Sequence, residues 1–237
     1  QVFVSDENDT LRTRLTHSME VAQITRDICR ALSLNEDLGE TVALAHDLGH
    51  SPFGHAGEDA LSDCLHQRGL PSFNHNLHTA KIVTVLERRY AAYDGLNLCW
   101  ETLEGIAKHN GPVHGDLAAD MERLFAGFDL ELHTHASAEA QVAALSDDIA
   151  YNTHDVDDGL RAGLLDFAAL ADVALPARAL RDIDATFPGL PADKRAFEVA
   201  RRMISELIGD VLSNSRGLLA AFAGRGPEDI RAHEAHV

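Results

Sequence analysis

Apolar residues recur along most of the chain at the three- and four-residue spacing of an α-helix. Val21, Ile24 and Ile28, for example, fall on one stripe of an expected helix. Asn35 and Ser137 stand immediately before two other such runs, where their side chains can cap a helix. The periodicity predicts helices over residues 16–32, 36–47, 56–68, 74–90, 98–108, 116–125, 138–160 and 194–212.

Strand-like alternation of apolar and polar residues is confined to a short candidate ribbon at residues 130–133. Breaks are expected at Leu175-Pro176 and at residues 188–191, where proline and glycine interrupt the helical spacing. The chain shows no internal repeat and no low-complexity linker. The sequence therefore predicts an all-α fold in a single domain that spans residues 1–237.

Composition is that of an ordinary folded protein. The 237 residues are 45% hydrophobic, which is enough for one domain with a sizeable core. No apolar run is long enough to cross a bilayer, so no membrane partner is expected. Cys29, Cys64 and Cys99 are odd in number and lack metal or redox spacing. We interpret them as reduced, mostly buried thiols of a cytoplasmic protein.

The charge balance narrows the choice of ligands. Thirty-eight acidic residues against twenty basic ones give a formal net charge of −18. Such a surface repels nucleic acid unless a local basic patch overrides it. It repels nucleotides too, so an enzyme for nucleotides would need a bound cation and a few well-placed basic residues. The fourteen histidines are many for this length, and their concentration within residues 46–78 indicates a site.

The densest stretch is HDLGHSPFGHAGED, residues 46–59, which follows an apolar helical run. The side chains of His46 and Asp47 leave a helix axis about 100° apart, so both can reach one ion beside the last turn. A glycine and a proline then end the helix. We therefore expect His50 and His55 to fold back over the same place.

Two distant residues complete a candidate metal site. His17 opens an amphipathic helix and Asp147 lies within another. With His46 and Asp47 they offer two imidazoles and two carboxylates, which suit Mn²⁺, Fe²⁺, Co²⁺, Ni²⁺ or Zn²⁺ and leave positions open for water and a phosphate oxygen. The absence of a thiolate argues against a structural zinc site. Taken singly, each residue could equally be a surface or helix-end polar group.

Two further spacings indicate chemistry. Glu58 lies three residues after His55, so the carboxylate can hold one tautomer of the imidazole and raise its basicity. Asp147, Tyr151 and Asp155 share a side of their helix that differs from its apolar side, as expected where a helix lines a cavity. The alternatives are a solvated ion pair and a buried tyrosine between solvated acids.

Arg14 lies three residues before His17 on the same expected helix. Its guanidinium can therefore lie near the metal, where its fork of donors would match phosphate oxygens.

The order H…HD…D of these residues resembles that of the HD-domain phosphohydrolases. Longer strings resemble the deoxyguanosine triphosphate triphosphohydrolase family, also called dNTP triphosphohydrolases. The resemblance covers residues 1–163 and is weak from Leu164 onward. The strings that carry it are RTRLTHSMEVAQ, HDLGHSPFGHAGED, FNHN, DGLNLCWETLEGIAKHNGP and SDDIAYNTHDVDDGL.

The resemblance implies a helical HD domain that cleaves a dNTP between the 5′ oxygen and the α-phosphorus, giving a deoxynucleoside and tripolyphosphate. Mn²⁺ is the first candidate for the metal, with Mg²⁺, Fe²⁺, Co²⁺, Ni²⁺ and Zn²⁺ as the others. Homo-oligomers such as hexamers, and a nucleotide or single-stranded DNA as effector, are also implied. Both ends of the chain look truncated relative to the family.

The family's roles carry over residue by residue. The metal ligands would be His17, His46, Asp47 and Asp147. The catalytic group would be His55 and Glu58, with His75 beside them. Arg14 and His50 would contact the phosphates of the substrate. Tyr151 and Asp155 would hold the deoxyribose, and the packed ring would leave no space for the 2′-hydroxyl of a ribonucleotide. The string Lys108-His109-Asn110 matches without an assigned role.

Two other readings remain open. The protein could be an HD phosphohydrolase of nucleoside monophosphates or other phosphate esters, or it could bind dNTPs or single-stranded DNA as a sensor. The complete ligand set and the pair His55 and Glu58 argue against a degenerate site, and the net charge argues against nucleic acid as the main ligand. His55 could act as an acid or as a nucleophile.

Overall fold

The computed structural model describes residues 13–125, 127–222 and 226–233, so the first twelve residues of the expected domain lie outside it. The described residues form helices and loops without a strand, which confirms the all-α prediction. The elements are α1 (Arg14–Leu32), α2 (Glu36–Ala45), α3 (Gly54–His66), α4 (His75–Lys81), the π-helical turn η1 (Ile82–Leu86), α5 (Trp100–Ala107), α6 (Gly115–Leu124), α7 (Ala138–Arg161), α8 (Phe167–Ala171), α9 (Ala174–Thr186), α10 (Ala192–Ala221) and α11 (Pro227–Arg231).

Polar side chains fix where the helices of the site begin. Thr13 and Thr16 form a reciprocal capping box at the start of α1. The Asn35 carboxamide oxygen accepts the first free N–H groups of α2, and the Ser137 hydroxyl accepts from Ala140 at the start of α7. Both predicted caps are confirmed. Each contributes about 1 kcal/mol to its helix.

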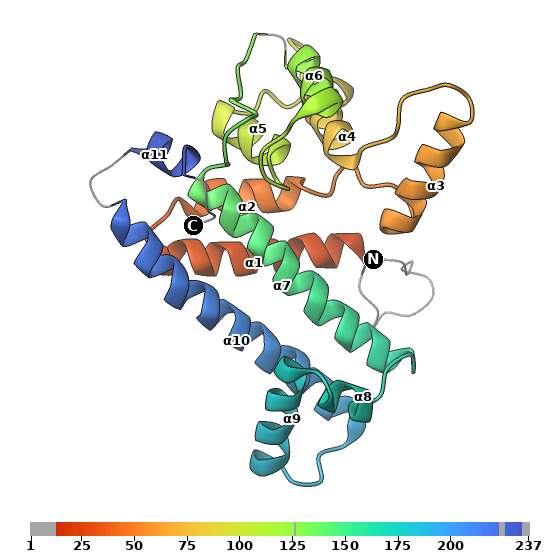
Figure 1. Cartoon of the computed structure of the whole chain (residues 1–237), viewed down its shortest axis with the longest axis vertical. Helices are drawn as coiled ribbons and strands as arrows, with labels where there is room; N and C mark the ends of the chain where they lie inside the picture. The colour runs from red at the N-terminus through yellow and green to blue at the C-terminus, as the bar shows by residue number, and fades with distance from the viewer. Residues whose placement is uncertain (1–12, 126, 223–225, 234–237) are drawn as a thin grey trace.

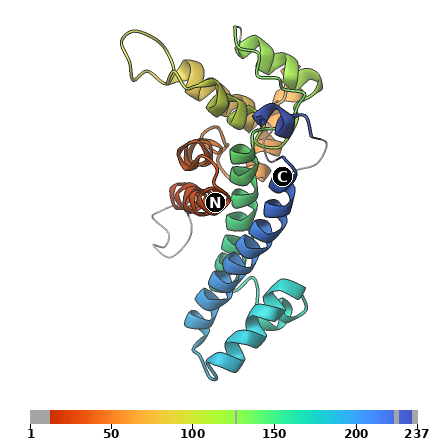
Figure 2. The same cartoon turned by 90° about the vertical axis from the view of Figure 1, so that its left-hand side faces the viewer.

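A central apolar cluster holds α1, α2, α7 and α10 together. Val21, Ile28 and Val42 are fully buried in it, and Val142 and Ile149 enter from α7. Burying a side chain of this size contributes roughly 1.5–3 kcal/mol. Figures 1 and 2 show α10 running alongside α7; α7 packs on both α1 and α2, and α10 adds contacts to α1. The predicted stripe of the first helix is confirmed as its buried face.

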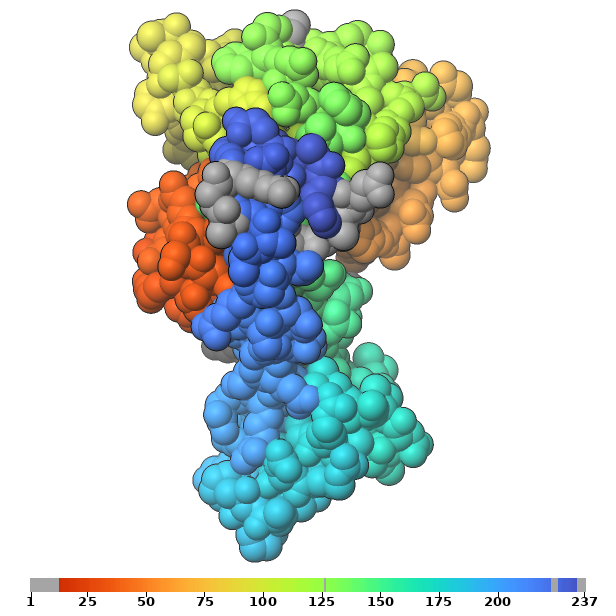
Figure 3. Space-filling view, turned by 60° about the vertical axis from the view of Figure 1, so that its left-hand side comes forward, coloured from red at the N-terminus to blue at the C-terminus, as the bar shows by residue number. Residues whose placement is uncertain are grey.

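Two smaller clusters lie at either end of this core. Ile106, Met121 and Leu130 belong to one that packs α4, α5 and α6 together. Ile183 and Val199 belong to the other, which joins α8 and α9 to α10 and forms the narrow end of the molecule in Figure 3. Among the described helices, none combines the length and apolarity that crossing a membrane requires.

The helix expected over residues 74–90 ends early. Its last turn widens into η1, and Glu87 leaves it in an extended conformation. The chain then turns back, and Gly95, whose φ of 75° suits a glycine, lies at the return point. Its backbone nitrogen lies 2.7 Å from the Glu87 carbonyl oxygen, to which it donates. The neighbouring N–H of Leu96 donates to the Val83 carbonyl. The return of the chain stops the helix, so the predicted length was wrong.

Three other predictions are corrected. Pro176 does not break the helix, because it lies in the first turn of α9, where a missing N–H costs no hydrogen bond. Residues 130–133 form no ribbon: a backbone bond from Val113 to the Leu132 carbonyl joins two loop segments. Cys29 is buried, but the other two free cysteines are exposed. The expected break at 188–191 is confirmed between α9 and α10.

A glycine brings the turn after α2 into close contact with α4. The N–H of Gly49 donates to the Thr79 hydroxyl, which itself donates to the His46 carbonyl. A Cβ atom added at Gly49 would lie 2.2 Å from the Thr79 nitrogen and 2.4 Å from the His75 carbonyl oxygen. Only a glycine allows this approach, which sets His46 against the start of α4.

We expect Gly49→Ala to lower the free energy of unfolding by about 2 kcal/mol, because the added methyl group pushes α4 away. Gly209→Ala is the matched control. Gly209 is exposed within α10 with open space around it, so alanine there should raise stability by about 1 kcal/mol. Urea denaturation followed by circular dichroism measures both. Equal stabilisation by the two substitutions would contradict the packing argument.

Candidate functional site

The structure brings three of the four predicted metal ligands, His17, His46 and Asp147, into one close group and places the fourth, Asp47, beside His46. His17 comes from α1, His46 and Asp47 from the turn that ends α2, and Asp147 from α7. Asp147 Oδ1 lies 2.8 Å from His17 Nε2 and 3.4 Å from His46 Nε2. Asp47 Oδ1 lies 3.5 Å from the same His46 nitrogen. The ligand atoms of His17, His46 and Asp147 all lie within 4.8 Å of one another.

Hydrogen bonding fixes the orientation of His46. Its Nδ1 lies 2.6 Å from the Ala43 carbonyl oxygen, which can only accept, so Nδ1 carries a proton and donates. Nε2 then faces the carboxylates, and this nitrogen and Asp47 Oδ2 are both buried without a hydrogen bond. Orphaned atoms of this kind, between imidazoles and carboxylates, fit a divalent cation.

Electrostatics favours positive charge at the same point. Burial is the largest influence on His46 and works to lower its pKa, but Asp147 and Asp47 outweigh it and raise that pKa to about 9. Burial likewise works to raise the pKa of Asp147, yet the hydrogen bonds from His109 and His17 and the nearby His46 ring hold it well below its usual range. Protons or a divalent cation can supply this charge.

Two residues that the sequence prediction missed support His17. His17 Nδ1 lies 3.3 Å from His154 Nδ1, and His154 Nε2 lies 2.7 Å from Glu20 Oε2. The carboxylate can only accept, so His154 donates from Nε2 and its Nδ1 can accept from His17. The other nitrogen of His17, Nε2, therefore faces Asp147, to which it donates, and this is the nitrogen that would face a bound cation. His154 follows Asp147 by seven residues, about two helical turns, which was the available signal.

The string Lys108-His109-Asn110, left without a role from the sequence, supports the site from α5. The His109 ring stacks on His46 with centroids 4.8 Å apart, and its Nε2 lies 3.5 Å from Asp147 Oδ2. Lys108 is fully buried and donates to Glu104 and Thr134. Burial lowers the pKa of Lys108 despite the Glu104 carboxylate. Lys108 thus ties α5 to the segment before α7.

His50, His55, Glu58 and His75 form a second cluster. His50 and His75 are stacked with centroids 4.7 Å apart, and the His55 centroid lies 4.9 Å from that of His50. Glu58 accepts from the backbone N–H of His75 and lies 2.9 Å from its Nδ1, against 3.4 Å for His55 Nδ1. Glu58 therefore holds His75 more closely than His55, whose side chain is 69% exposed.

Burial acts on the pKa values of two members of this cluster, Glu58 and His50. It works to raise the pKa of Glu58, but the backbone N–H and the imidazole of His75 bring that pKa below its usual value. Burial also lowers the pKa of His50, and this favours the neutral imidazole. The cluster therefore combines an ionised carboxylate with at least one neutral ring.

Both clusters line one pocket of about 560 Å³. Tyr151 and Asp155 of α7 line it too, and Asp155 and then burial raise the pKa of Tyr151. Arg14 lies at the metal cluster, where its Nη2 donates to the Asp47 carbonyl oxygen. An adjoining hollow of about 420 Å³ shares His109, Asn110, Asp147 and Asp148 with this pocket. The structure thus gathers all the predicted site residues around one region.

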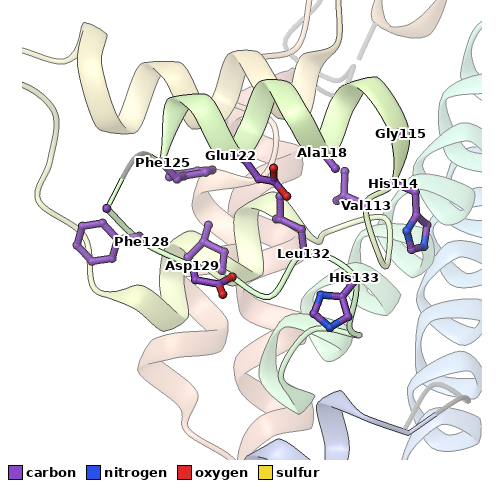
Figure 4. A pocket seen from close by; sticks show the side chains of 12 residues that line it. Val113, His114, Gly115, Ala118, Glu122, Phe125, Phe128, Asp129, Leu132 and His133 are labelled. Atoms are coloured by element: carbon purple, nitrogen blue, oxygen red, sulfur yellow. The ribbon is translucent and has the colours of Figure 1, made fainter.

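A separate hollow of about 660 Å³ lies between α6 and the segment that follows it. Phe125 and Phe128 lie at one end and His114 and His133 at the other (Figure 4). It shares no lining residue with the histidine-rich pocket. His133 and His135 are close in sequence and could suggest a pair of metal ligands. His133 lines this hollow, whereas His135 lines the hollow beside Asp147, so the two do not form a site together.

Comparison with known proteins agrees with this geometry. The HD domain family matches residues 14–152. A deoxyguanosinetriphosphate triphosphohydrolase-like protein of Ruegeria sp. is 55% identical over 98% of this chain and 60% of its own length. Proteins of the same name from Paracoccus denitrificans and Jannaschia sp. are 54% and 56% identical, over 100% and 98% of this chain and 62% and 58% of their own lengths.

The chain therefore spans about three fifths of the length of these relatives. The alignment with the Paracoccus denitrificans protein extends over residues 164–237 as well. The chain belongs to the HD domain family, among its deoxyguanosinetriphosphate triphosphohydrolase-like members.

Proposed function

We propose that the protein is a metal-dependent hydrolase that converts a dNTP to a deoxynucleoside and tripolyphosphate. One observation carries the proposal. Two clusters contribute residues to the same pocket. The cluster around Asp147 is stabilised by a positive charge at its centre, and the cluster around Glu58 has imidazoles that can hold a proton. Hydrolysis of a phosphate ester needs both a means of offsetting phosphate charge and a proton for the leaving oxygen.

His17, His46, Asp47 and Asp147 would hold the cation, with Mn²⁺ as the first candidate. Bound there, a divalent ion supplies Lewis acidity toward a phosphate oxygen and a water molecule. The residues themselves orient it: Ala43 and His154 hold the outer nitrogens of the two imidazoles. Arg14 adds a fixed positive charge on the same side and would bind phosphate oxygens together with His50.

His55 would deliver the proton. Its exposed ring lies in the pocket beside Glu58 and His75. Water would add to the α-phosphorus and release its protons, one of which returns to His55, while the bond from that phosphorus to the 5′ oxygen breaks and the 5′ oxygen takes the proton that His55 held. The Glu58 carboxylate, 3.4 Å from His55 Nδ1, would orient the ring for this transfer. The products are a deoxynucleoside and intact tripolyphosphate.

The shape of the site favours a nucleoside triphosphate over a monophosphate. The main pocket and the adjoining hollow meet at Asp147, so a ligand held at the cation can extend in two directions. Tyr151 and Asp155 follow Asp147 along α7 by one and two turns. The Tyr151 ring would pack against the deoxyribose where a 2′-hydroxyl would otherwise lie, while Asp155 would accept from the 3′-hydroxyl.

The remaining parts of the proposal come from the resemblance. We expect a homo-oligomer such as a hexamer, acting in the cytoplasm, with a nucleotide or single-stranded DNA as effector. These stay predictions.

Product analysis tests the function directly. We expect the Mn²⁺-supplemented protein to convert dNTPs, but not ribonucleotides, to deoxynucleosides and tripolyphosphate, resolved by anion exchange. Each dNTP is tested alone and in a mixture, since a second nucleotide could act as effector. Orthophosphate as the product would indicate an HD phosphohydrolase of other esters. No turnover under any of these conditions would indicate a sensor instead.

We expect His55→Ala to lower turnover at least a hundredfold while leaving metal content unchanged, because it removes the proton donor and no metal ligand. The exposed position should keep stability within about 0.5 kcal/mol. His114→Ala, an exposed histidine on the far hollow, is the matched control. Activity of His55→Ala close to that of the control would contradict the assignment.

His154→Ala should weaken Mn²⁺ binding by roughly ten- to a hundredfold, since His17 then loses the partner that fixes its tautomer. Isothermal titration calorimetry measures the affinity, and Glu20→Gln should have a smaller effect in the same direction. Asn152→Ala, exposed on the same helix, is the control. Unchanged affinity in a folded His154→Ala protein would show that the hydrogen-bonded chain does not support the metal.

A further inference from the structure

The second histidine cluster has the composition of a metal site. One ligand atom from each of His50, His55, Glu58 and His75 lies within 4.8 Å of the others. The three imidazole centroids are 4.7, 4.9 and 5.7 Å apart. Three nitrogens and one carboxylate oxygen at this spacing could close around a single ion once one of the two stacked rings tilts toward the other ligands.

A buried atom in the cluster lacks a partner. His50 is only 8% exposed, and its Nδ1 is buried without a hydrogen bond. The ring lies flat against His75, with 10° between the planes, so it cannot turn toward solvent without breaking this stack. A buried polar nitrogen of this kind is unfavourable unless something binds it.

We propose that His50, His55, Glu58 and His75 form a second cation site, selective for Zn²⁺, and that an ion bound there inhibits the enzyme. Three imidazoles and one carboxylate complete a tetrahedral Zn²⁺ shell. The site around Asp147 has two carboxylates and suits harder ions. Imidazole-rich sites bind Zn²⁺ far more tightly than Mn²⁺, so the two clusters differ in the ions they prefer.

The inhibition rests on the proposed function of His55, whereas the binding does not. An imidazole that binds Zn²⁺ through one nitrogen cannot also be an imidazolium that donates a proton. Zn²⁺ and the catalytic proton therefore compete for His55. Excess Mn²⁺ would replace an ion lost from the cluster around Asp147. It should not relieve inhibition by Zn²⁺ bound at the cluster around Glu58.

Counting bound Zn²⁺ tests the site. Equilibrium dialysis followed by elemental analysis should give two ions per wild-type chain and two for the His114→Ala control. His55→Ala should lose one ion, or bind it at least about tenfold more weakly, without a folding defect, and His75→Ala should do the same. Asp147→Ala should lose the other ion and keep this one. In the visible spectrum, Co²⁺ at a four-coordinate site absorbs strongly, so this band should vanish in His55→Ala and persist in Asp147→Ala.

The outcomes separate this inference from the proposed function. A wild-type chain that binds one Zn²⁺, or a second ion that persists in both His55→Ala and His75→Ala, would overturn the site, whatever the protein hydrolyses. Zn²⁺ that raises turnover at saturating Mn²⁺ would overturn the inhibitory role. Two ions with the expected variant pattern would establish the site even if no dNTP is hydrolysed.

Discussion

The partly buried carboxylate of Asp147 is the constraint on which the rest of the site depends. A carboxylate that has lost much of its contact with water needs positive charge or donors beside it, and here three imidazoles from three other segments surround it. His17, His46 and His109 can meet there because α1, α2, α5 and α7 pack against one another. The apolar core beneath fixes the spacing of these helices, so packing and charge compensation specify the same arrangement.

Two clusters of similar composition share the pocket, but they differ in the helices that supply them and in how buried their side chains are. The first lies where α1, α2 and α7 meet, among fully buried side chains. The second lies between α3 and α4, where Gly49 allows the chain to approach α4 closely. A rigid, buried setting suits an ion that must stay bound, and a setting with one exposed ring suits a proton that must move. The net charge of −18 would make a cation at the first cluster more important for the proposed function, since such a surface repels an anionic ligand.

The sequence predicted those features that depend on local pattern. Helical periodicity identified the all-α class and the buried faces of α1 and α7, because burial follows the 3.6-residue repeat. The candidate ligands were visible because they cluster within short strings. The sequence did not reveal the contact from Glu20 to His154, since the two lie 134 residues apart and only the packing of α1 on α7 joins them. The sequence also did not predict that the helix ends at Leu86, since this end depends on a chain reversal that is completed only at Gly95.

The second nitrogen of each imidazole decides what the ring can do. In the first cluster the Ala43 carbonyl and His154 hold the outer nitrogens of His46 and His17, so the other nitrogen of each ring is fixed toward Asp147. In the second cluster Glu58 holds His75 in the same way, but its contact with His55 is longer and the ring is exposed. His55 is therefore the one imidazole among these four that is free to exchange a proton with a ligand. The same freedom leaves it open to capture by a cation, so a site suited to proton transfer here is also vulnerable to Zn²⁺.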